Sequence, residues 1–109
     1  MVQSAALSGV IGRVEDIPLG EGREYRLGEE TIAVFRTRTG AVHAVQARCP
    51  HRDGPLADGL VGAGRVVCPL HGHAFELATG ASARPDCAAL RTYPVTVNER
   101  GELVLTGSA

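Results

Sequence analysis

Four side chains that can bind a metal ion fall in two short segments of the sequence. Each of the segments Cys49-Pro50-His51 and Cys68-Pro69-Leu70-His71 contains one thiol and one imidazole, and sixteen residues separate them. A single tight turn can direct both side chains of such a pair toward one point. Thiolates and imidazoles are ligands for zinc, copper and iron. The spacing therefore predicts a metal site with four ligands, which are Cys49, His51, Cys68 and His71.

The order of these ligands narrows the choice of metal. Cys₂His₂ zinc fingers usually place both cysteines in one pair and both histidines in the other, and the second pair lies on a helix. Here each pair is mixed, and Pro50, Pro69 and Gly72 exclude a helix across either pair. A Rieske [2Fe–2S] centre binds one iron through two cysteines and the other through two histidines. Two loops that each supply one of each meet this requirement, and a structural zinc site is the alternative.

Two longer motifs surround the ligand pairs. They read CPHRDGPLADG over residues 49–59 and CPLHGHAFELATG over residues 68–80. Both resemble the cluster-binding motifs of the Rieske ferredoxin family, and the similarity extends from about residue 10 to residue 105. The resemblance implies an all-β Rieske fold. In that fold an antiparallel, β-barrel-like base carries a cluster-binding subdomain made of two loops, here at about residues 48–80.

The same resemblance assigns the ligands of a Rieske-type [2Fe–2S] cluster. It implies that Cys49 and Cys68 bind one iron as thiolates. It implies that His51 and His71 bind the other, solvent-facing iron through imidazole nitrogen. Two thiolates and two neutral imidazoles carry less negative charge than four thiolates, so such a cluster accepts an electron more easily than an all-cysteine one.

Four positions near the ligands differ from the high-potential respiratory members of the family. Those proteins join the two loops by a disulfide, at the positions of Gly54 and Leu70, and place hydroxyl donors at the positions of His73 and Phe75. Without these donors the reduced, more negative cluster is less stabilised. We therefore predict a reduction potential at the low end of the Rieske range, near about −150 mV.

Other residues of the two motifs have expected supporting roles. Leu56, Leu60 and Leu70 are expected to pack beneath the cluster, and the backbone N–H of Gly72 is a candidate donor to a bridging sulfide. His73 is expected to be a solvated residue near the tip. His43 is expected to be a surface histidine or a core histidine with satisfied hydrogen bonds, and not a ligand.

Short strands separated by turns account for the rest of the sequence. Alternating apolar residues and β-branched runs predict them, and no segment shows a sustained helical period. The expected strands lie at residues 10–14, 25–27, 31–38, 41–47, 65–67, 93–98 and 102–106. We expect turns at Gly20–Gly22, at Thr39-Gly40 and at Glu99–Gly101, and an irregular connection over Ala81–Arg91.

Length, composition and charge limit the classes of protein. The 109 residues predict one domain, 1–109, with a modest core. No apolar run is long enough to span a membrane, and residues 1–10 do not resemble a signal peptide. A net charge of −1 with mixed signs gives no basis for nucleic-acid or membrane partners. Three cysteines leave Cys87 over, which fits a reducing compartment, so we expect a cytoplasmic protein.

These features predict an electron carrier and not an enzyme. The resemblance implies one-electron transfer from a flavin-dependent reductase to a terminal oxygenase. The small subunit of an NAD(P)H-dependent nitrite reductase is an alternative, and a zinc-stabilised interaction module is another. Independent catalysis is not expected, because only His43 and His73 remain after the cluster takes two histidines, and they do not resemble the two-His, one-carboxylate iron site of Rieske oxygenases.

Overall fold

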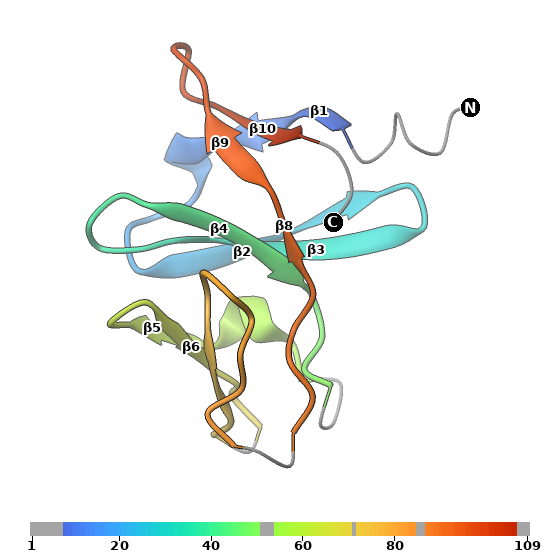
Figure 1. The fold of residues 1–109 in the computed structure, drawn as a ribbon. Helices are drawn as coiled ribbons and strands as arrows, with labels where there is room; N and C mark the ends of the chain where they lie inside the picture. The colour runs from blue at the N-terminus through green and yellow to red at the C-terminus, as the bar shows by residue number, and fades with distance from the viewer. Residues whose placement is uncertain (1–7, 51–53, 71, 85–86, 107–109) are drawn as a thin grey trace.

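A computed structural model of the chain describes residues 8–50, 54–70, 72–84 and 87–106. Within these ranges the structure consists of short strands in three antiparallel sheets, with two single-turn 3₁₀ helices (Figure 1). This confirms the predicted all-β fold class. The elements are β1 (Ser8–Arg13), η1 (Val14–Asp16), β2 (Glu21–Leu27), β3 (Glu30–Arg36), β4 (Val42–Gln46), η2 (Leu56–Asp58), β5 (Leu60–Gly62), β6 (Arg65–Val67), β7 (Ala74–Glu76), β8 (Thr92–Tyr93), β9 (Val95–Val97) and β10 (Glu102–Thr106).

The central sheet has the strand order β2-β3-β4-β8, and β3 is its most buried strand. Residues 32–35 of β3 are all buried because β3 lies between two neighbours and both of its faces are covered. A tight turn joins β3 to β4, where Gly40 donates its N–H to the carbonyl of Thr37 at 2.9 Å. Gly40 has a φ of +94°, which favours glycine. The predicted Thr39-Gly40 hairpin turn is thus confirmed.

The glycines at residues 20 and 22 have different roles. Gly20 lies in the turn before β2 with a φ of +82°, as predicted. Gly22 lies within β2 opposite Phe35, and a Cβ atom there would lie 2.6 Å from the Phe35 ring. The predicted turn therefore ends at Gly20, because β2 begins at Glu21. At Gly22 the missing side chain makes room for the aromatic ring.

The predicted strand over residues 93–98 is divided between two sheets. Pro94 has no N–H to contribute to a ladder and separates β8 from β9. β8 pairs with β4 in the central sheet, whereas β9 pairs with β10 in the sheet β1-β10-β9. The prediction of one continuous strand was wrong here, although the hairpin turn between β9 and β10 is confirmed by the bond from Gly101 N–H to the Asn98 carbonyl at 3.0 Å.

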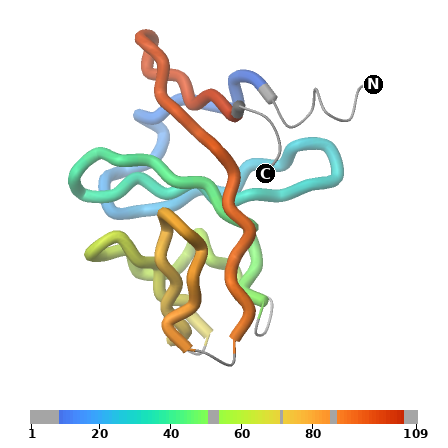
Figure 2. The backbone as a smooth tube through the Cα atoms, viewed as in Figure 1, coloured from blue at the N-terminus to red at the C-terminus, as the bar shows by residue number. Residues whose placement is uncertain are grey.

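The sheets β2-β3-β4-β8 and β1-β10-β9 together form the base of the domain. The chain leaves this base after β4 and returns to it at β8, and the segment between these two strands is called the excursion (Figure 2). The described part of this excursion contains the third sheet, β5-β6-β7, and the predicted ligands Cys49 and Cys68. One apolar core cluster lies between the central sheet and this excursion, and it includes Phe35, Val45, Leu56 and Phe75. Among the described residues, no helix is long and apolar enough to cross a membrane.

Candidate metal centre

The first ligand segment lies in a loop that follows β4, and hydrogen bonds join the two ends of this loop. Leu56 donates its N–H to the Ala47 carbonyl at 3.1 Å, and Arg48 forms an isolated antiparallel bridge with Pro55. Inside this closure, the N–H of Cys49 donates to the Gly54 carbonyl at 2.9 Å. Cys49 is buried at the start of the loop. Its predicted partner His51 lies outside the described residues.

The second ligand segment is the turn of the hairpin between β6 and β7. Cys68 directly follows β6 and donates its N–H to the His73 carbonyl at 2.8 Å. The N–H of Gly72, whose φ is +72°, donates to the Cys68 carbonyl at 3.0 Å. The expectation that Gly72 directs its N–H toward a sulfide was therefore wrong, because this N–H closes the turn. His71 lies outside the described residues.

The two loops meet at Cys68. A Cβ atom on Gly54 would lie 2.5 Å from the Cys68 Sγ atom and 3.2 Å from Leu70 Cγ. Cys49 and Cys68 belong to the same buried apolar cluster. Each of the three cysteines is described, and each carries a thiol that is not in a disulfide. The fold therefore brings Gly54 and Leu70 together, the positions at which respiratory members of the family place their disulfide.

This arrangement fits a Rieske-type cluster. Two buried thiols lie in one core cluster, each at the start of a tight loop, and the absence of a side chain on Gly54 leaves room beside the Cys68 sulfur. The residues described do not by themselves form a group of three or more metal-binding side chains. The complete ligand set remains a prediction, because it depends on His51 and His71.

The three leucines expected beneath the cluster have different environments. Leu56 has no exposed surface and lies in the core cluster with both cysteines, as expected. Leu60 is 77% exposed and Leu70 is 54% exposed, so the expectation was wrong for both. Leu60 begins the edge strand β5. Leu70 lies in the turn outside the paired strands, although it contacts Gly54.

Both histidines that were not predicted as ligands have defined positions. His73 is only 6% exposed, so the expectation of a solvated residue was wrong. The Cys68 turn uses the His73 carbonyl, and β7 begins at the next residue, which places His73 inside the hairpin and not at its tip. His43 lies half-buried in β4, opposite Phe35 of β3, and burial lowers its pKa. The expectation that His43 is not a metal ligand stays a prediction.

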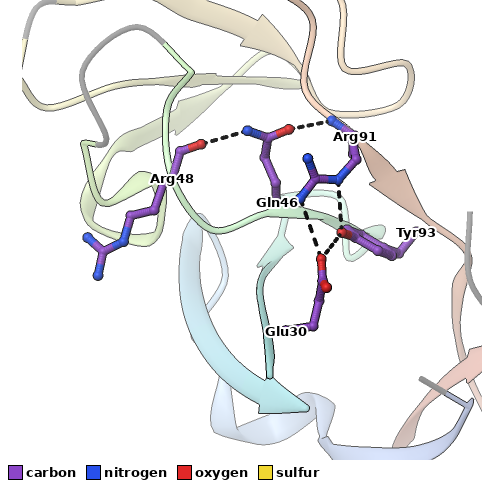
Figure 3. Close-up of polar contacts among 5 residues, drawn as sticks. All are labelled: Glu30, Gln46, Arg48, Arg91 and Tyr93. Carbon is purple, nitrogen blue, oxygen red and sulfur yellow. Dashed lines mark hydrogen bonds and ion pairs between the residues drawn. The ribbon is translucent and has the colours of Figure 1, made fainter. Parts of the chain in front are cut away.

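A polar network joins the first loop to the base (Figure 3), and no local pattern of residues predicted it. Glu30 lies in β3, Gln46 in β4 and Tyr93 in β8, and Arg91 is the residue directly before β8. The Tyr93 hydroxyl donates to Glu30 Oε2 at 2.9 Å, and Arg91 Nη2 lies 3.4 Å from the same oxygen. Burial raises the pKa of Tyr93, so the hydroxyl remains a donor at neutral pH. These partners are far apart in sequence, and only the strand register brings them together.

The fold and the paired thiols define the class of protein, a small β-domain that holds an iron–sulfur cluster between two loops. The family model of the Rieske [2Fe-2S] domain matches residues 8–94 of this chain. The chain therefore belongs to the Rieske [2Fe-2S] domain family. Family membership implies a Rieske-type [2Fe–2S] cluster as the cofactor.

Two curated relatives show the range of proteins that contain a similar sequence. The chain is 39% identical over 84 residues to the 4beta-methylsterol monooxygenase of Methylococcus capsulatus, covering 67% of this chain but 22% of the monooxygenase. It is 32% identical over 93 residues to the biphenyl dioxygenase ferredoxin subunit of Pseudomonas sp. strain KKS102, covering 84% of both chains. The chain thus spans about a fifth of the length of the first relative and most of the second.

A solved structure shows the same fold. A Mycobacterium tuberculosis protein assigned as an NADH-dependent nitrite reductase small subunit superposes with a TM-score of 0.81 at 25% identity. The match covers 90% of this chain and 92% of that protein. Most of this chain therefore has the same fold as that protein.

Proposed function

We propose that this chain is a one-electron carrier whose [2Fe–2S] cluster is bound by Cys49, His51, Cys68 and His71. We further propose that residues 1–109 form a single domain, with the cluster-binding subdomain at about residues 48–80. The observation that carries the proposal is the contact between the loops, where Gly54 of the first loop lies against the Cys68 sulfur of the second. It supports a shared site, because each loop contributes one buried thiol to the same core cluster.

The proposed ligands suit electron transfer better than catalysis. The cluster supplies one-electron redox chemistry when it is bound. In this proposal the chain supplies the thiolates of Cys49 and Cys68, which lie in one buried cluster with Leu56 and Phe75, and the imidazoles of His51 and His71. The resemblance to the family implies that the imidazole-bound iron faces solvent, and electrons then pass through the imidazoles to a partner. We therefore propose a carrier that works with a partner enzyme and is not itself an enzyme.

An anaerobic redox titration followed by EPR tests the cluster and its potential. The expected result is a Rieske-type signal on reduction, with a midpoint near about −150 mV. The physical reason is that Gly54, Leu70, His73 and Phe75 provide neither an inter-loop disulfide nor hydroxyl donors. A midpoint well above zero contradicts the low-potential assignment. Zinc in place of iron, with no EPR signal, contradicts electron transfer and supports a structural zinc module.

Serine variants of the three cysteines test the ligand assignment with an internal control. Cys49→Ser and Cys68→Ser are expected to abolish the visible absorption and reduce the iron content to background. Cys87→Ser is the matched control and is expected to retain both, since Cys87 lies half-buried at the edge of the core. Full cluster content in Cys49→Ser or Cys68→Ser would refute the ligand set.

The relatives support two settings for the carrier. The ferredoxin subunit of a biphenyl dioxygenase, similar over 84% of both chains, supports transfer from a flavin-dependent reductase to a terminal oxygenase. The fold shared with the nitrite reductase small subunit supports the alternative setting. The three thiols support work in a reducing compartment such as the cytoplasm. We propose neither nucleic acid nor a membrane as a partner, because the net charge is −1 with mixed signs.

The two settings differ in how tightly the partner is held. A shuttling ferredoxin needs a small transient interface, whereas a permanent subunit needs a larger one. To distinguish the two settings, the protein is reconstituted with a flavin reductase and a ring-hydroxylating oxygenase, or with a nitrite reductase large subunit. The turnover rate of each system is then measured. Co-elution with the nitrite reductase subunit at micromolar concentration, without turnover of the oxygenase, would favour the alternative.

A further inference from the structure

The peptide group between Arg48 and Cys49 is held at both ends. Its carbonyl accepts a hydrogen bond from Gln46 Nε2 at 2.9 Å, and its N–H donates to the Gly54 carbonyl at 2.9 Å. A peptide group is planar, so two bonds on opposite sides fix its orientation. That orientation determines the direction in which the Cys49 side chain leaves the backbone.

The amide of Gln46 bridges this peptide group to a distant segment. Gln46 Oε1 accepts a hydrogen bond from the Arg91 N–H at 2.7 Å, and the Gln46 N–H donates to the Arg91 carbonyl at 3.0 Å. Arg48 presents a carbonyl and Arg91 presents an N–H, so one orientation of the amide satisfies both. Figure 3 shows the Gln46 side chain between these two residues.

Arg91 is in turn attached to the base and to the second loop. Its guanidinium contacts Glu30 and Tyr93 of the central sheet. Its neighbour Leu90 donates an N–H to the Gly80 carbonyl at 2.8 Å, and Gly80 donates to the Glu76 carbonyl in β7 at 2.7 Å. The Gln46 amide therefore lies where the first loop, the segment after the second loop and the base are joined.

We propose that Gln46 is a positioning residue for the cluster, which acts by fixing the peptide group that precedes the ligand Cys49. This inference depends on the cluster site proposed above. Without the amide, the Arg48 carbonyl loses this donor, whereas the bond from the Cys49 N–H to the Gly54 carbonyl remains. The Cys49 thiolate then samples a wider range of directions, and the cluster is bound less firmly. The two bonds of the amide lie on the exposed side of the loop, so water replaces part of what is lost.

Two substitutions separate this role from general stability. Gln46→Met removes both bonds of the amide, whereas Gln46→Glu keeps an acceptor for the Arg91 N–H but cannot donate to the Arg48 carbonyl when ionised. Glu29→Gln is the matched control, because Glu29 lines the same surface groove but is not part of the network. Each protein is isolated with its cluster, and three properties are measured: the EPR g-values, the rate of loss of visible absorption at fixed temperature, and backbone amide exchange.

Both Gln46 variants are expected to lose the cluster about two to ten times faster than the wild type, with shifted g-values. Glu29→Gln is expected to match the wild type. If Gln46→Met does not fold, Gln46→Glu alone tests the proposal. Variants that equal Glu29→Gln in g-values and in cluster loss would overturn the proposal.

Amide exchange in the wild type tests the geometry independently of the cluster. The Arg91 and Cys49 amides are expected to exchange slowly, because both donate hydrogen bonds. Exchange of the Arg91 amide at the rate of an unstructured peptide would overturn the proposal even if the cluster is present. A wild-type protein without iron but with both amides protected would refute the proposed function while leaving the bridge intact.

Discussion

The two ligand loops are held by different kinds of interaction. The Cys68 loop is the turn of a paired hairpin, with β6 on one side and β7 on the other. The hydrogen bonds that close this turn run between backbone groups of Cys68, Gly72 and His73. The Cys49 loop lies between β4 and β5, which belong to different sheets; besides one isolated bridge and the backbone bonds of Cys49 and Leu56, the side chains of Gln46 and Leu56 hold it.

This difference implies unequal tolerance of substitution. A backbone ladder is kept by almost any side chain that accepts an extended conformation, whereas a side-chain clamp is lost with a single residue. We therefore expect substitutions of supporting residues to affect the Cys49 loop more than the Cys68 loop. The predictions below test this contrast, beginning with the largest effect.

Leucines in the two loops provide the most direct test. Leu56→Ala removes a fully buried side chain below the first loop and is expected to lower the free energy of unfolding by about 2–5 kcal/mol. Leu70→Ala in the second loop removes a half-exposed side chain and is expected to change it by about 0.5 kcal/mol or less. Chemical denaturation followed by circular dichroism measures both. Similar losses of unfolding free energy in the two variants would contradict the predicted difference between the two loops.

A methyl group at the contact between the loops is the second test. Gly54→Ala places a Cβ atom 2.5 Å from Cys68 Sγ, so one loop must move. The expected cost is about 1–3 kcal/mol, with reduced iron content. Gly62→Ala in β5 is the control, because a Cβ atom there meets nothing within 4 Å and its φ is not in the left-handed region. Normal iron content in Gly54→Ala would mean that the loops separate without loss of the site.

Loss of one hydroxyl tests the attachment of the first loop to the base. Tyr93→Phe removes the donor to Glu30 and the acceptor for Arg91 Nε, and is expected to cost about 1 kcal/mol. Tyr25→Phe, at a half-buried tyrosine outside this network, is the comparison. Thermal unfolding and amide exchange at Arg91 are the measurements. Equal unfolding temperatures for the two variants would show that the network contributes nothing to stability.

The smallest expected effect is a pH dependence of the stability that originates at His43 in the central sheet. Burial lowers the pKa of His43, so near pH 6 the unfolded chain binds more protons at this residue than the folded chain does. The contribution to stability is complete above the ordinary histidine pKa of about 6.5 and is lost as the pH falls below it. Unfolding temperatures of the wild type and His43→Gln, measured from pH 7.5 to 5.5, should converge toward low pH. A constant difference would exclude this role.

Local patterns predicted much of the fold correctly. The β-branched run in β3, the turn at Gly40 and the hairpin at Gly101 were all predicted from neighbouring residues. Local patterns failed where a neighbour in space decided the outcome. Gly22 is a strand residue and not a turn residue, and the Phe35 ring occupies the space that a side chain there would need. Pro94 divides one predicted strand between two sheets.

The sequence by itself determined the class of site. Two mixed pairs of cysteine and histidine, separated by sixteen residues, predicted a Rieske-type cluster, and the family match supports that class of cofactor. Alternation along a strand shows which residues share a face but not which face is covered. The exposure of Leu60 and the burial of His73 were therefore decided by the tertiary structure alone. Only the strand register placed Gln46 beside Arg91, forty-five residues away. Long-range contacts of this kind depend on how the sheets pack together, and no local pattern of residues encodes them.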